Sequence, residues 1–267
     1  MEIEDQVLEE AWKGSLPLRV SLSKLDIASH EMPQDFYAMV SRNSYLPNLI
    51  ETVSKHFELY TSTDFTLDSI WFSYNSVPLK WHYQLGLLVD LNSKLKDGVL
   101  LLNLPFHVEV HFHRFPTEEL LPLNGIKSIR SIFQNALKES SALLLGTSAA
   151  VMNLSRDQEE NMWKYRNEGK YKEFRETGSA FIKLERKDCR YVPVKFIDPK
   201  LNLLTLFPIL ANDNLSVSQA AKLAFPDFSG ALVCQGIILP EESEIFWLWS
   251  NLSHPDNFLY ITCLSEQ

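Results

Sequence analysis

The sequence has few cysteines and no long apolar run. Its 267 residues include three cysteines, Cys189, Cys234 and Cys263, without a Cys-x-x-Cys pair. This spacing predicts neither a disulfide framework nor a thiolate zinc knuckle. The longest apolar run, around residues 99–106, is interrupted by Asn103 and is too short to span a bilayer. Because the N-terminus is acidic and lacks the apolar core of a secretory signal, we expect a cytoplasmic protein.

Basic residues are also scarce, with 25 Lys and Arg against 34 Asp and Glu and a formal charge of -9. Phosphate neutralisation supplies most of the non-specific affinity of nucleic-acid binders, so this balance argues against nucleic acid as a partner. It also argues against strong adhesion to anionic lipid, so we expect at most weak or indirect membrane contact. Only the stretch 164–190 is locally basic. Its pattern fits a membrane or partner surface, or an ordinary solvated helix face, which is the commoner case.

The usual catalytic signatures are missing. The sequence contains no Gly-x-Ser-x-Gly, Gly-x-Gly-x-x-Gly, Walker A or His-Glu-x-x-His motif. Cys234 and Cys263 lie in apolar strand patterns, where burial raises a thiol pKa, and Cys189 has no evident base beside it. We therefore interpret the cysteines as structural, and predict no catalytic residue and no cofactor.

One cluster could hold a metal ion. His107, His111 and His113, with Glu109, occupy one face of a predicted strand over 106–113. Alternate strand positions can reach a single zinc ion, and two histidines with a glutamate form a known catalytic set. The same alternation is typical of a strand with one face on a core and one in water. We favour the second interpretation and keep a zinc-dependent enzyme as the alternative.

Hydrophobic periodicity divides the chain into three parts. Strands and short helices alternate up to Pro116, helices follow, and strands return near residue 191. The predicted strands cover 18–22, 70–74, 77–81, 106–113, 191–197, 203–210, 231–236 and 258–263. The predicted helices cover 2–14, 46–57, 85–91, 126–145, 155–177, 216–225 and 243–251. On a helical wheel of 126–145, Lys138 lies opposite the apolar stripe that includes Ile129 and Phe133, so we expect its amine in solvent.

The two ends of the chain share an order of elements: strand, helix, strand, turn, short apolar element, small helix and final strand. In the second copy, residues 232–240 resemble the third and fourth strands of a ubiquitin-like β-grasp, and residues 70–79 are their counterpart. We therefore predict an α+β protein with two ubiquitin-like domains flanking a helix-rich domain. The predicted boundaries are an N-terminal helix over 1–14, domains over 15–116 and 181–267, and the helix-rich domain over 117–180.

Several strings carry a resemblance to a known family. They are Trp12-x-Gly14, Pro78-Leu79-Lys80-Trp81-His82-Tyr83 with Leu85-Gly86-Leu87-Leu88, Val110-His111-Phe112 with Phe115-Pro116, Tyr191-Val192-Pro193-Val194, and His254-Pro255-Asp256-Asn257-Phe258-Leu259. In this order they resemble the autophagy-related protein five family. The resemblance runs from near residue 6 to residue 264.

The resemblance implies a scaffold that carries no active site of its own. Family members are joined through one lysine to the C-terminal glycine of the ubiquitin-like autophagy-related protein twelve. The matching string here is Leu137-Lys138-Glu139, which makes Lys138 the expected isopeptide acceptor. The conjugate is expected to bind the coiled-coil autophagy-related protein sixteen. It is then expected to act like an E3, promoting transfer of autophagy-related protein eight from its conjugating enzyme to phosphatidylethanolamine at the preautophagosomal structure.

Two further expectations concern partners. The coiled-coil helix is expected in an apolar groove between the domains, with the N-terminal helix and the region around Trp81 as candidate surfaces. A ubiquitin-like adaptor that is never conjugated remains a third reading, beside the scaffold and the zinc enzyme.

Overall fold

The structure is a computed structural model that describes residues 2–62, 64–182, 184–200 and 203–266. The chain folds as two compact units. The N-terminal unit contains residues 15–89 and 103–131, and the C-terminal unit contains residues 1–14, 90–102 and 132–267. Each unit contains a five-stranded mixed sheet with the same strand order, and the C-terminal unit also holds most of a helical bundle. The predicted α+β fold with two ubiquitin-like domains and a helix-rich part is confirmed.

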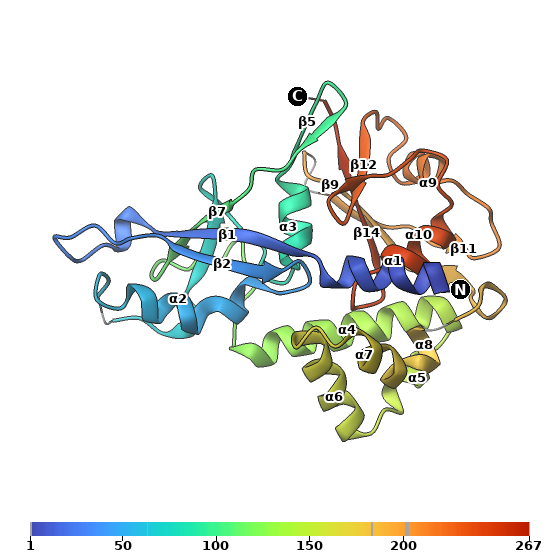
Figure 1. Cartoon of the computed structure of the whole chain (residues 1–267), viewed down its shortest axis with the longest axis horizontal. Helices are drawn as coiled ribbons and strands as arrows, with labels where there is room; N and C mark the ends of the chain where they lie inside the picture. The colour runs from blue at the N-terminus through green and yellow to red at the C-terminus, as the bar shows by residue number, and fades with distance from the viewer. Residues whose placement is uncertain (1, 63, 183, 201–202, 267) are drawn as a thin grey trace. The chain divides into compact units, whose positions relative to one another are not determined.

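The sheet of the N-terminal unit has the order β2-β1-β7-β3-β4. Its strands are β1 (Ser15–Leu22), β2 (Phe36–Ser41), β3 (Trp71–Tyr74), β4 (Val77–Pro78) and β7 (Phe106–His111). The first and last strands, β1 and β7, are parallel, and the other pairs are antiparallel. The unit's helices are α2 (Ile50–Phe57), α3 (Leu85–Leu91) and the 3-10 turns η1 (Lys24–Asp26), η2 (Leu46–Leu49) and η3 (Leu67–Ser69). Figure 1 shows α2 lying along β1 and β2.

Alternation explains how this sheet forms its core. Phe106, Val108 and Val110 of β7 are at most 1% exposed, while the residues between them reach solvent in part. Helix α2 buries Ile50 and Phe57, which lie seven residues apart and therefore on the same face of the helix. The prediction that β7 has one face on a core is therefore confirmed.

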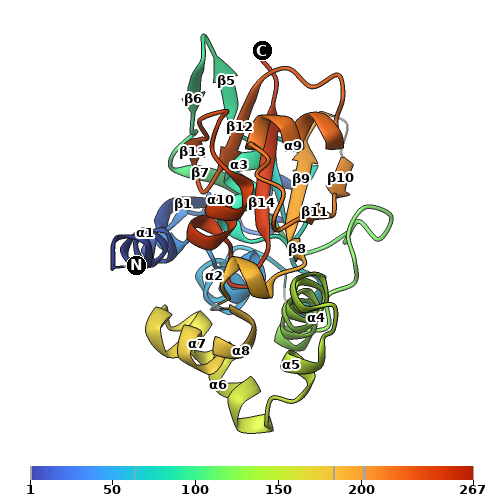
Figure 2. The same ribbon diagram turned by 90° about the vertical axis from the view of Figure 1, so that its right-hand side faces the viewer.

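The sheet of the C-terminal unit has the order β10-β9-β14-β12-β13, again with a parallel central pair, β9 and β14. Its strands are β9 (Val194–Asp198), β10 (Leu203–Leu206), β12 (Ala231–Cys234), β13 (Ile237–Ile238) and β14 (Leu259–Leu264), beside the small ladder of β8 (Tyr191–Val192) and β11 (Ile209–Leu210). Helices α9 (Val217–Ala224) and α10 (Ile245–Leu252) share one core with one face of this sheet (Figure 2). Both faces of β14 are buried, with only Tyr260 half-buried.

The helical bundle contains α1 (Glu2–Lys13), α4 (Ile126–Leu145), α5 (Ala149–Met152), α6 (Arg156–Asn167), α7 (Tyr171–Thr177) and α8 (Ser179–Ile182), with η4 (Arg186–Asp188) following. Its core joins Trp12 of α1 to Phe133, Tyr171 and Phe174. The bounds predicted for α4 are confirmed. The helix predicted over 155–177 is two helices, because Gly169 adopts a φ of +69° and ends the first of them.

Several elements were not predicted: besides the short helices α5 and α8, they include strand β2 and a β-hairpin. Strand β2 forms one edge of the first sheet, and a hairpin of β5 (Lys94–Lys96) and β6 (Val99–Leu101) turns at Asp97 and Gly98, both with positive φ. The hairpin belongs to the C-terminal unit, where Leu95 packs against Val233 and Leu264. In the chain as described, no helix is both long and apolar enough to span a membrane.

Candidate functional site

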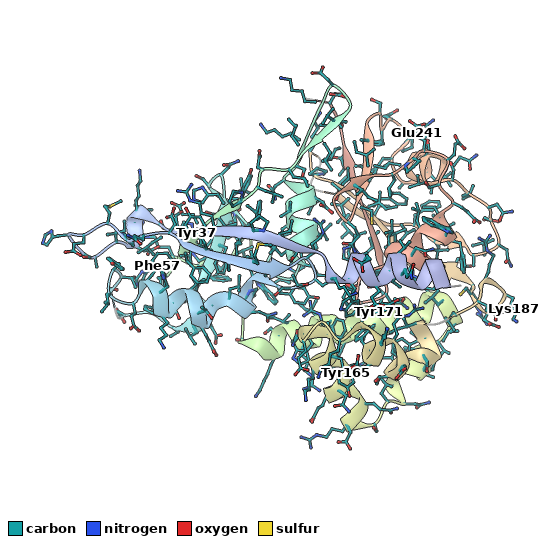
Figure 3. The ribbon with its side chains drawn as sticks, in the orientation of Figure 1. Tyr37, Phe57, Tyr165, Tyr171, Lys187 and Glu241 are labelled. Carbon is teal, nitrogen blue, oxygen red and sulfur yellow. The ribbon has the colours of Figure 1, made fainter. Side chains whose placement is uncertain are left out.

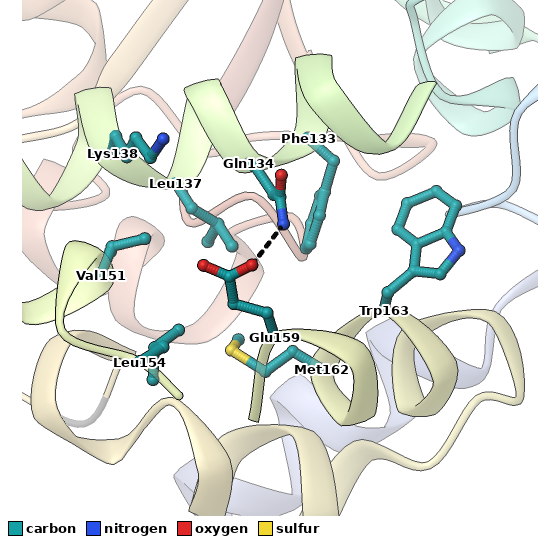
Figure 4. A pocket seen from close by; sticks show the side chains of 9 residues that line it. All are labelled: Phe133, Gln134, Leu137, Lys138, Val151, Leu154, Glu159, Met162 and Trp163. Carbon is teal, nitrogen blue, oxygen red and sulfur yellow. Dashed lines mark hydrogen bonds between the residues drawn. The ribbon is translucent and has the colours of Figure 1, made fainter. Parts of the chain in front are cut away.

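Lys138, the expected isopeptide acceptor, lies on α4 and is half-buried rather than fully exposed as the helical wheel of α4 alone predicted. It lines a small cavity of about 20 Å³, room for about one water molecule. The other lining residues come from α4, α5, α6 and the α5–α6 connection: Phe133, Gln134, Leu137, Val151, Leu154, Glu159, Met162 and Trp163 (Figure 4). Helix α6 therefore partly covers the side of α4 that carries Lys138.

Acidic groups near Lys138 are few. The positions one helical turn away are Gln134, Asn135, Ser141 and Ala142, so α4 offers no carboxylate at the spacing that forms ion pairs within a helix. Across the cavity, Glu159 of α6 accepts a hydrogen bond of 3.2 Å from the Gln134 amide. The Lys138 side chain therefore runs along a helix face that has no partner built for its amine at helical spacing.

The residues after Lys138 fasten α4 to the second sheet. The Glu139 carboxylate forms a 2.8 Å ion pair with Lys195 of β9. The Lys195 ammonium lies 3.6 Å from the centre of the Phe258 ring, a cation–π contact. The Ser140 hydroxyl donates to the Asp256 carbonyl at 3.1 Å. These contacts fix the rotation of α4 about its axis, and so the direction in which Lys138 leaves the helix.

Residues 254–259 form the other side of this contact between α4 and the second sheet. Asp256 is buried, and its carboxylate accepts from the Tyr260 hydroxyl at 2.8 Å and from the Phe258 amide at 3.2 Å. Burial raises the pKa of Asp256, against the opposing effect of the Tyr260 hydrogen bond. Asn257 adopts a φ of +67°, donates to the Phe181 carbonyl at 2.9 Å and accepts from the Trp249 indole at 3.0 Å. One short loop thereby joins α8, α10 and the sheet.

The histidines of the first sheet do not converge on a metal site. His107 contacts Ser21 at 2.9 Å, and His113 forms a 2.8 Å contact with Asp26. The His111 ring stacks on Trp71 with the ring centres 3.8 Å apart and lies 2.8 Å from the Ser73 hydroxyl. Burial lowers the pKa of His111, while Glu109 and Asp26 act in the opposite direction. Within the described residues no group of three His, Cys, Asp or Glu is placed to hold a metal ion, so the geometry does not support the zinc alternative.

The three cysteines lie in apolar surroundings. Cys234 and Cys263 are at most 1% exposed and Cys189 is 6% exposed. Burial, with smaller effects of Asp188 and Asp198, raises the pKa of Cys189 to about 11 and that of Cys263 to about 12. Neither of these two thiols is poised as a nucleophile at neutral pH.

Two candidate partner surfaces, the region around Trp81 and the basic stretch 164–190, can be compared with the burial and contacts of their side chains. Trp81 is 5% exposed and donates its indole N–H to the Leu121 carbonyl at 2.7 Å, so its side chain belongs to the core, and the region around it remains a predicted partner surface. In the basic stretch 164–190, Arg166 is 5% exposed and lies over the rings of Phe133 and Trp163. Several other cations of this stretch are paired with acids or donate to Tyr171. This pairing favours the solvated-helix interpretation.

The sequence did not point to Glu159, Gln134 or the Glu139–Lys195 pair. Glu139 was visible in the sequence as the acidic neighbour of Lys138, but its partner was not. Contacts of α4 with α6 or β9 join residues far apart in sequence, so they leave no local pattern. The string at 254–259 was noted, but its role as a joint follows only from the burial of its polar side chains.

Comparisons with known proteins agree with this architecture. Three family models match in order: "Autophagy protein ATG5, UblA domain" at residues 11–112, its alpha-helical bundle region at 126–183 and its UblB domain at 191–263. Autophagy protein 5 of Arabidopsis thaliana is 34% identical over 59% of this chain and 44% of its own length, so the match spans less than half of that relative. Autophagy protein 5 of Drosophila melanogaster is 26% identical, with 96% of each protein covered.

The fold is also that of a solved structure. The crystal structure of Kluyveromyces marxianus Atg5 matches with a TM-score of 0.84 at 20% identity, covering 97% of this chain and 99% of that one. Two ubiquitin-like sheets with a helical bundle between them in sequence define a protein with a duplicated ubiquitin-like fold. The chain belongs to the autophagy protein 5 family.

Proposed function

We propose that the chain is a non-catalytic autophagy scaffold that becomes covalently joined to a ubiquitin-like modifier through Lys138. The observation that carries the proposal is the set of contacts around this lysine on α4. Its neighbours Glu139 and Ser140 are fastened to the C-terminal unit, while Lys138 has no carboxylate at helical spacing on α4. An amine attacks only in its neutral form, and α4 adds no carboxylate at ion-pairing spacing that would bind the ammonium form.

The bond formed is an isopeptide. The neutral Lys138 amine attacks the thioester that links the modifier's C-terminal glycine to a conjugating enzyme. A C–N bond forms, the C–S bond breaks, the thiol leaves and the amine's extra proton passes to solvent or to a base of the enzyme. By family resemblance the modifier is autophagy-related protein twelve.

The conjugate's later role follows from the same resemblance. We propose that it binds the coiled-coil autophagy-related protein sixteen and stimulates lipidation of autophagy-related protein eight with phosphatidylethanolamine. The cytoplasmic chain would then be recruited to the preautophagosomal membrane through its partners, in keeping with its charge of -9.

The test is reconstitution with the modifier and its activating and conjugating enzymes, followed by intact mass and peptide mapping. The wild-type chain is expected to gain one modifier on the peptide that contains residue 138. Lys138→Arg keeps the charge and is expected to abolish the adduct, while Lys127→Arg, at an exposed lysine of the same helix, leaves it unchanged. An adduct on Lys138→Arg sinks the acceptor assignment, and no adduct on the wild type favours the unconjugated adaptor.

A further inference from the structure

The C-terminal unit contains a second, much larger hollow that the conjugation site does not use. Its volume is about 500 Å³, within the range of ligand-binding sites. We call it the hairpin pocket, and its lining residues are Leu95, Gly98, Ser218, Ala221, Lys222, Phe228, Ser229, Gly230, Ala231, Leu232, Ile238, Leu239, Glu241 and Glu266. They come mainly from the β5–β6 hairpin, α9, β12 and the end of β13 (Figures 1 and 2).

The floor of the hairpin pocket is apolar. Leu95, Ala221, Leu232 and Leu239 are all at most 5% exposed, and each is packed in the core of the unit. The charged lining residues Lys222, Glu241 and Glu266 are exposed instead. A small polar metabolite requires polar groups converging on it, whereas this arrangement suits an apolar side chain held below a polar mouth.

An exposed sheet edge lies beside the pocket. Strand β13 pairs only with β12 among the described residues, and its Ile237 and Ile238 are 51% and 36% exposed. Unpaired backbone groups on such an edge are the usual place for an extended peptide to add as a strand, with its side chains seated in neighbouring pockets. The edge and the pocket therefore suit the same kind of ligand.

The rim carries a negative excess. Glu241 and Glu266 oppose the single cation Lys222, and all three are exposed. Figure 3 places Glu241 at the surface of the unit. One Glu266 oxygen accepts from the Gly98 amide at 3.0 Å, which ties this carboxylate to the hairpin turn. A basic side chain on the ligand would complement this rim.

We propose that the hairpin pocket binds an extended segment of a partner protein. The segment inserts one bulky apolar side chain into the apolar part of the hairpin pocket and places a lysine or arginine beside Glu241 and Glu266. The site is independent of Lys138 and does not rest on its conjugation.

The test is selection of random dodecapeptides displayed on phage against the full chain, followed by anisotropy measurements with fluorescein-labelled copies of the enriched peptides. Enriched peptides are expected to share a bulky apolar residue near a lysine or arginine. Ser218→Trp, which fills the pocket, and Ile238→Asp, which charges its wall, are each expected to weaken binding by about tenfold or more. Glu241→Lys is expected to weaken it by about threefold to tenfold at low salt, and less at high salt.

Two matched variants control for general damage. Leu223→Trp adds the same side chain to an exposed position of α9 outside the pocket, and Val77→Asp adds the same charge at an exposed position of β4, the edge strand of the first sheet. Both are expected to bind like wild type, and circular dichroism melting verifies that every variant folds. Failure to enrich any peptide, or equal binding by pocket and control variants, overturns the proposal. So does a concentration-dependent dimer that Ile238→Asp abolishes, because the occupant would then be a second copy of the chain.

Discussion

The two ubiquitin-like sheets have equivalent strand orders, but they differ in the residues that occupy one face. The hairpin registers align them position by position: Ser73 pairs with Glu109 in the first sheet, and Val233 pairs with Thr262 in the second. The next pair on the same face, two residues along, is Trp71 with His111 in the first sheet and Ala231 with Leu264 in the second. Three of these four positions are therefore polar in the first sheet, Ser73, Glu109 and His111, where the second sheet has three apolar residues and Thr262.

The difference follows from what covers that face within each unit. In the C-terminal unit the β5–β6 hairpin places Leu95 and Leu100 against Val233 and Leu264, and α4 approaches through the Glu139–Lys195 pair. Both faces are covered, so its strands are apolar runs rather than alternating ones. In the N-terminal unit β7 keeps the alternation of a half-solvated strand. The comparison shows that the elements packed on a face of the sheet, and not the shared strand order, account for the residue types on that face.

The largest expected effect comes from exchanging one equivalent pair. Thr262 is fully buried and its hydroxyl has no hydrogen-bond partner among the described residues, so Thr262→Glu is expected to cost more than about 4 kcal/mol and to unfold the C-terminal unit. Glu109→Thr, at the half-exposed counterpart, is expected to change stability by less than about 0.5 kcal/mol. Urea unfolding followed by tryptophan fluorescence measures both. Similar losses from the two substitutions would break the comparison.

A smaller effect is expected at Asn257, in the loop that connects α8, α10 and the second sheet. Asn257→Ala loses the hydrogen bond to the Phe181 carbonyl and places alanine at a φ of +67°, which together should cost about 2–3 kcal/mol. Asn257→Gly loses the same hydrogen bond but tolerates the backbone, so about 1 kcal/mol of the loss should return. Thermal unfolding of both variants separates the two causes. Equal losses would show that backbone conformation contributes nothing there.

The smallest effect concerns acid sensitivity of the first unit. Burial, helped by Lys80, lowers the pKa of His82 from 6.5 to about 4. Because the folded pKa lies below the unfolded one, the stabilisation is complete above about pH 6.5 and is lost as the pH falls through about 4. His82→Gln is expected to reduce the loss of stability between pH 7 and pH 5.5 by about 1 kcal/mol, measured as the free energy of unfolding at both pH values. The exposed His30→Gln serves as the control and should leave this loss unchanged.

Elements whose signal is local could be predicted from the sequence. The alternation of 106–113 gave β7 its inner and outer faces, and the apolar stripe of 126–145 gave α4 its length. Strand β2 has no such signal, because Tyr37 and Met39 are apolar yet 62% and 67% exposed. The hairpin did carry one, the Asp97-Gly98 dipeptide typical of two-residue turns, but its strands are three residues each and bury against residues far along the chain.

The site was predictable only in part for the same reason. Resemblance to the family pointed to Lys138, and the wheel placed it away from the stripe of α4. Its half-burial depends on α6, and the fastening of Glu139 depends on Lys195 of β9, neither of which leaves a pattern near residue 138. The bounds predicted for the domains remain predictions.

The route of the chain through the β5–β6 hairpin limits how the molecule can be dissected. Residues 90–102 lie between two segments of the N-terminal unit in sequence, yet they complete the C-terminal unit. A single cut between the ubiquitin-like domains therefore removes this lining from the fragment that needs it, and leaves Val233 and Leu264 bare. Deletion fragments that no longer bind a partner should accordingly be compared with fragments to which residues 90–102 are added as a separate peptide. Otherwise, aggregation through the exposed apolar face of the sheet could be mistaken for loss of a binding site.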